Sequence, residues 1–178
     1  MTLDALLQHQ AALLALAELG PEAMRATVDR ALDEGIYQDD FIDAMYPGPY
    51  PPSDRPRKAS VALLAARGFA VPDRHAAMWR VIASHMHRIA DGRCDARREL
   101  TALIDVIDHR PELGEKVTTH LGDAFGIEWL IGHHWRFHEL EESPDRVSCG
   151  GFYGVEAIDH LKHLTRVEAL RWLDVHGA

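Results

Sequence analysis

Apolar side chains recur at intervals of three and four residues along most of the 178-residue chain, with glycine, proline or aspartate between the runs. This spacing places them on one face of an α-helix, because successive residues turn by about 100°. The clearest stripe consists of Leu100, Leu103, Ile104 and Ile107. The pattern predicts an all-α protein, an irregular bundle of roughly seven helices. We expect the whole chain, residues 1–178, to form a single helical domain.

Helix start and stop signals set the order of the elements. Thr2, Asp73 and Asp95 are suitable N-cap residues for helices that begin directly after them. Gly20 followed by Pro21 marks the end of a first helix over residues 3–19 and the start of a second. Two further helices are expected over residues 126–142 and 155–176, with a loop at 143–154. Residues 116–121 are the one place where a short hairpin or edge strand is the alternative.

The last helix carries an unusual apolar pattern. Its apolar residues recur every three positions: Ile158, Leu161, Leu164, Val167, Leu170 and Leu173. A step of three residues falls 60° short of a full helical turn, so this stripe migrates around the helix. We therefore expect the two halves of the helix to bury different faces, or the helix to bend near Thr165.

Proline divides the chain near residue 50. Five of the nine prolines fall within residues 47–57, a density that excludes a helix or a central strand. We predict an extended connector there, which joins an N-terminal helical layer, residues 1–46, to a main bundle, residues 58–178. A polyproline ligand for an aromatic groove of a partner is the alternative.

The chain is acidic, with a net charge of −9 when histidine is neutral. Phosphate contacts supply most of the affinity for nucleic acids, so this charge argues against nucleic-acid binding and against an anionic membrane surface. It suits a basic protein partner. Residues 47–110 are nevertheless net +4 between acidic flanks of −7 and −6, which favours internal complementarity. Two cysteines without zinc-like spacing and an N-terminus without a basic leader predict a cytoplasmic protein.

Histidine supplies the one chemical cluster, since phosphate-binding, nucleophile-elbow and zinc-protease motifs are absent. His134 and His138 share a helix face at i, i+4 spacing, and His85 falls inside another apolar stripe. With Glu141 and His160 they could hold a divalent transition metal such as zinc, iron or nickel. The alternative is that these histidines are hydrogen-bonded core residues. If His85, His134 and His138 are buried and neutral, mild acid should destabilise the fold.

A second candidate site lies beside the proline-rich segment. Asp39, Asp40 and Asp43 form a local acidic face, and Tyr46 and Tyr50 are residue types typical of interfaces. We therefore expect a soluble, non-enzymatic binding or regulatory protein, of the inhibitor or immunity type that neutralises a basic target. A metal-dependent enzyme or metal-binding protein that uses the histidines is the alternative. Neither reading indicates an oligomeric state.

Overall fold

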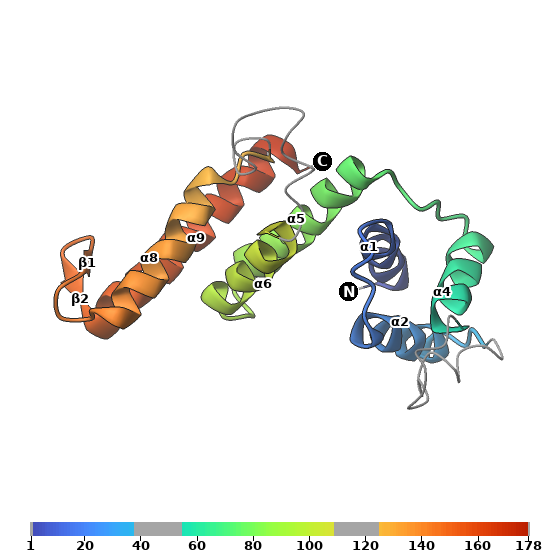
Figure 1. Cartoon of the computed structure of the whole chain (residues 1–178). Helices are drawn as coiled ribbons and strands as arrows, with labels where there is room; N and C mark the ends of the chain where they lie inside the picture. The colour runs from blue at the N-terminus through green and yellow to red at the C-terminus, as the bar shows by residue number, and fades with distance from the viewer. Residues whose placement is uncertain (1, 38–54, 109–124, 178) are drawn as a thin grey trace. The chain divides into compact units, whose positions relative to one another are not determined.

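The computed structural model describes residues 2–37, 55–108 and 125–177. These residues form seven α-helices and one two-stranded antiparallel sheet, which confirms the prediction of an all-α fold of several helices (Figure 1). The described helices include none that is both long enough and apolar enough to cross a membrane. The chain divides into two compact units, Met1–Val81 and Ile82–Ala178, and the division falls inside helix α5 (Arg74–Asp91).

The first unit is built on α1 (Leu3–Ala15), α2 (Pro21–Asp33) and α4 (Arg55–Ala66). The Oγ1 of Thr2 caps α1 by accepting a hydrogen bond from Ala5 N, as predicted, although α1 ends four residues earlier than expected. Buried apolar side chains of the three helices form one core: Leu3, Leu7, Ala11, Leu14, Val28, Ala31, Leu63 and Leu64. Within it, Gln10 of α1 donates a buried 2.7 Å hydrogen bond to Ser60 of α4.

The start of α4 differs from the sequence expectation. The helix begins at Arg55, whereas residues 47–57 were expected to be extended throughout. Pro56 is the second residue of the helix, where a missing N–H leaves no helical hydrogen bond unmade. Residues 47–54, and the possible edge strand at 116–121, lie outside the described residues.

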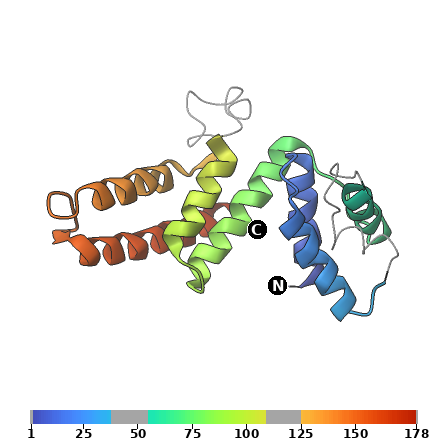
Figure 2. The same ribbon diagram turned by 60° about the horizontal axis from the view of Figure 1, so that its bottom comes forward.

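The second unit contains α6 (Ala96–Asp108), α8 (Glu128–Glu142) and α9 (Gly154–His176), besides the end of α5. Figures 1 and 2 show α8 and α9 side by side along their length, with α6 next to them. The predicted stripe of α6 is buried as expected, and Asp95 caps the helix with a 3.0 Å hydrogen bond from Arg98 N. Helix α8 contributes Leu130, His134, Phe137 and Leu140 to the interior.

The buried face of α9 corrects the prediction of a migrating stripe. That face consists of Ala157, Leu161, Thr165, Ala169 and Trp172, in steps of three or four residues, and it lies within about 120° around the helix axis. Leu170, which the three-residue pattern assigned to the interior, is 54% exposed. Three of its five residues, Ala157, Thr165 and Ala169, have small side chains.

The segment expected to be a loop at 143–154 contains a hairpin. Strand β1 (Ser148–Cys149) pairs with β2 (Phe152–Tyr153), with Ser148 opposite Tyr153 and Cys149 opposite Phe152. Gly150 and Gly151 form the two-residue turn with φ of +60° and +85°. Two positive φ values are what a type I′ hairpin turn requires, and glycine adopts them without steric cost.

Candidate functional site

The structure separates the predicted metal ligands into different local environments. His85 of α5 is buried, and its Nδ1 lies 2.7 Å from Oε1 of Glu99 on α6. Arg88 donates from Nε to the same oxygen and from Nη1 to the Ser84 hydroxyl. His85 therefore belongs to a partly buried ionic cluster that ties α5 to α6.

Glu99 is the electrostatic centre of this cluster. Burial alone would raise the pKa of its carboxyl group, but hydrogen bonds from His85 and Arg88 lower the pKa to about 2. The carboxylate is thus ionised at neutral pH and satisfied by two donors. Such an arrangement stabilises a helix pair, and it leaves His85 Nδ1 occupied by Glu99.

His134 and His138 do lie together on α8, as their spacing predicted. Their ring centroids are 4.7 Å apart, and Trp135 packs edge-on against His134. His134 is buried but His138 is exposed, so the prediction that both point into the interior is wrong for His138. Burial and the neighbouring His138 lower the pKa of His134. The neutral imidazole is therefore the resting form of His134.

The two remaining candidate ligands have other contacts. Glu141 forms a two-pronged ion pair with the Nη1 and Nη2 of Arg97 on α6. The His160 ring packs against Phe152 with centroids 5.2 Å apart, and it lies close over Gly150 of the hairpin turn. Among residues 2–37, 55–108 and 125–177, no group of three or more His, Cys, Asp or Glu side chains is arranged to hold a metal ion.

The second predicted site cannot be placed. Asp39, Asp40, Asp43, Tyr46 and Tyr50 all lie outside the described residues.

A different surface gathers exposed apolar side chains at the end of the α8–α9 pair, where Figure 1 shows the hairpin. Phe152, Tyr153 and Val155 are 43%, 55% and 73% exposed. Four exposed carboxylates lie on the adjoining turns: Glu142, Asp145, Glu156 and Asp159. We call these seven residues the hairpin tip; it combines an apolar centre with acidic neighbours.

Backbone contacts hold the hairpin tip in a defined conformation. Arg136 of α8 donates a 2.7 Å hydrogen bond from Nη2 to the carbonyl oxygen of Ser148. Gly154 N donates to the carbonyl oxygen of Pro144 at 3.0 Å, which closes the segment between the two helices. A surface fixed in this way loses little conformational entropy when it binds a partner.

No protein-family model matches this chain, and neither a curated protein nor a solved structure shows significant similarity to it. The functional assignment therefore depends on the chemistry of the described side chains.

Sequence reasoning missed the hairpin tip, although a signal was present. Gly150-Gly151 between two short runs of strand-forming residues is a hairpin signal. The flanking strands have only two residues each, too few for an alternating pattern to be recognised. The exposure of Phe152 and Tyr153 could be found only once the turn was known.

Proposed function

We propose that this protein is a non-enzymatic binding protein that uses the hairpin tip to recognise a basic protein. The observation that carries the proposal is the exposure of Phe152, Tyr153 and Val155 on an ordered hairpin. Aromatic side chains are enriched at the centres of interfaces, where they contribute much of the binding energy.

The charge around the tip favours a basic partner. Glu142, Asp145, Glu156 and Asp159 outnumber the two arginines near the tip, Arg136 and Arg146. A carboxylate rim of this kind steers a positively charged partner and repels an acidic one. This agrees with the net charge of −9 and with the sequence expectation of an inhibitor or immunity type of protein. We further infer a cytoplasmic location, which the free thiols of Cys94 and Cys149 support.

Site-specific photo-cross-linking tests the proposal. A benzophenone side chain in place of Tyr153 should capture a basic protein from cells of the source organism, and one in place of Val71 should not, since Val71 is 45% exposed on the other unit. The captured protein, once purified, then serves as a defined ligand for titration.

The titration compares variants that each remove one exposed apolar side chain. Phe152→Ala and Tyr153→Ala should each weaken binding by about tenfold or more, whereas Leu170→Ala, remote on α9, should change it little. Glu156→Gln with Asp159→Asn should slow association and reduce its salt dependence. An acidic captured partner, or equal affinities for the Tyr153 and Leu170 variants, would refute the assignment.

A further inference from the structure

The solvent face of α8 carries a symmetric pattern centred on Gly132. Reading outward from this glycine, Trp129 and Trp135 lie three residues away on either side, and Glu128 and Arg136 lie four residues away. At 100° per residue all four fall within about 60° of Gly132 around the helix axis. This face is opposite the buried residues Leu130, His134 and Phe137.

The two indoles on this face are exposed to an unusual degree. Trp129 is 70% exposed and Trp135 is 59% exposed. Each tryptophan presents on the order of 150–250 Å² of surface, most of it apolar. Side chains of this size on a solvent face are typical of an interface centre. Neither belongs to the hairpin tip.

Gly132 has no role in the packing of its own chain. A Cβ atom added there would meet no atom within 4 Å, and its φ is not among the positive values. Glycine inside a helix weakens it relative to alanine, so its presence in the middle of α8 calls for a reason. The absence of a side chain between two exposed indoles allows another helix backbone to approach closely.

We propose that two copies of this chain associate through this face, with their α8 helices antiparallel and crossing at Gly132. A two-fold axis at the crossing sets each residue against the one equally far beyond Gly132 in the other copy. Trp129 then meets Trp135 of the partner subunit, and Glu128 meets Arg136 of the partner subunit. The pattern is self-complementary in both apolar surface and charge. The partner that fits this face of α8 is therefore a second copy of the same chain.

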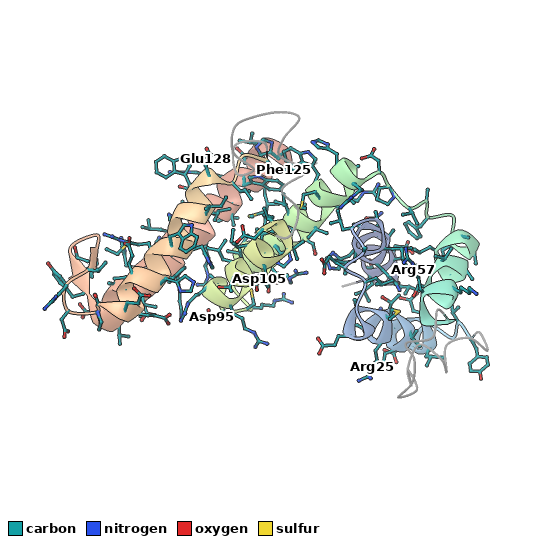
Figure 3. All side chains as sticks on the ribbon, in the orientation of Figure 1. Arg25, Arg57, Asp95, Asp105, Phe125 and Glu128 are labelled. Carbon is teal, nitrogen blue, oxygen red and sulfur yellow. The ribbon has the colours of Figure 1, made fainter. Side chains whose placement is uncertain are left out.

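Local geometry is compatible with this pairing. Glu128 lies at the start of α8, near Phe125 (Figure 3). Arg136 donates from Nη1 to Glu139 and from Nη2 to the Ser148 carbonyl oxygen, and a guanidinium group with five N–H donors keeps others for a carboxylate. A hollow of about 140 Å³ opens beside Trp129, between it and Trp172, Val175 and His176 of α9.

The interface is small. Four indoles together would bury on the order of 600–1,000 Å², and a stable specific interface buries about 1,200–2,000 Å². We therefore expect a dissociation constant in the micromolar range, which sedimentation equilibrium of the full chain can measure. The wild-type chain should shift from monomer to dimer as its concentration rises from about 1 to 500 μM.

Gly132→Ala should have opposite effects on the stability of the monomer and on the affinity of the dimer. Alanine should raise the melting temperature of the monomer, because it is the better helix former and meets no neighbour. It should also weaken the dimer, because two methyl groups then separate the helices at the crossing. Trp135→Ala should weaken the dimer about tenfold or more, and Leu170→Ala, at a position that is 54% exposed on α9, should leave it unchanged.

Charge exchange tests the antiparallel register. Glu128→Arg sets two arginines against each other, and Arg136→Glu sets two glutamates against each other, so each variant alone should remain monomeric. An equal mixture should form a heterodimer, because every opposing pair is then of opposite charge. A wild-type chain that stays monomeric, a dimer that Gly132→Ala and Trp135→Ala leave intact, or a mixture that stays monomeric would overturn the proposal.

Discussion

Glu99 shows how one residue can decide the stability of a helix pair. Its carboxylate accepts from His85 and Arg88 on α5, and its side chain is only 16% exposed. We expect Glu99→Gln to lower the free energy of unfolding by about 2 kcal/mol, because two charge-assisted hydrogen bonds are weakened and an arginine loses its counter-charge. Urea denaturation at pH 7 measures the difference.

The matched control is another carboxylate on an interhelical pair. Glu141 binds Arg97 across α8 and α6, but both side chains are more than a third exposed. Since water screens such a pair, Glu141→Gln should change stability by less than about 1 kcal/mol. Equal losses for the two variants would show that burial of Glu99 does not matter.

Residue-level signals were predictable where they depend on neighbours in the sequence. The caps Thr2, Asp73 and Asp95 were recognisable because an N-cap bonds to a backbone N–H only three residues away. The side chain with which each glutamate pairs was not predictable, because nothing in the sequence distinguishes Glu99 from Glu141. Only the packing of α5 against α6 makes His85 a partner of Glu99.

At the level of elements, two glycines should respond in opposite ways to alanine. Gly150 in the hairpin turn has φ of +60°, and an added Cβ would lie 2.5 Å from Nε2 of His160. Gly150→Ala should therefore destabilise the fold by about 1–2 kcal/mol through backbone strain and displacement of the ring. Gly132→Ala, in the open middle of α8, should instead stabilise the monomer by up to about 1 kcal/mol.

Thermal melts of both variants, at concentrations low enough to keep the chain monomeric, provide the comparison. For a chain of this size 1 kcal/mol corresponds to about 2–4 °C in melting temperature. A melting temperature of Gly150→Ala at or above that of the wild type would contradict the strained turn.

The elements themselves were predictable to different degrees. The α6 stripe was right because its four apolar residues repeat at the true helical period. The α9 stripe was wrong because several faces of that helix carry apolar side chains, and its packing against α8 and α6 selects the one that is buried. Local periodicity cannot contain that information, because it belongs to the neighbouring helix.

At the scale of the whole molecule, acid acts through two opposing effects. The net charge of −9 falls in magnitude as histidines take up protons, which relieves repulsion between surface carboxylates. Buried imidazoles act in the other direction, because protonation places a charge where water is excluded. The repulsion between surface carboxylates is screened within about 8 Å at physiological salt. We therefore expect the buried imidazoles to determine how the stability changes with pH.

Partly buried His133 and buried His134 determine whether acid raises or lowers the stability. Burial lowers the pKa of His133, against the opposing effect of Glu168, and burial also lowers the pKa of His134. Their folded-state pKa values lie below the unfolded value of 6.5, so the unfolded chain binds protons first as the pH falls below 6.5. Stability is therefore complete above pH 6.5 and decreases below it. Glu99 acts in a separate window, because its contribution is present above its unfolded pKa of 4.5 and is lost towards pH 2.

Melting temperatures between pH 8 and pH 5 therefore test the second unit as a whole. We expect a plateau above about pH 6.5 and a decline below it that persists at high salt. His134→Gln should flatten the decline, because a neutral amide takes up no proton, whereas His87→Gln should leave it unchanged because His87 is exposed on α5. A melting temperature that stays constant to pH 5, or that falls equally in both variants, would place the titrating groups elsewhere. Because the decline follows from burial between α8 and its neighbours, it also reports whether that packing forms in solution.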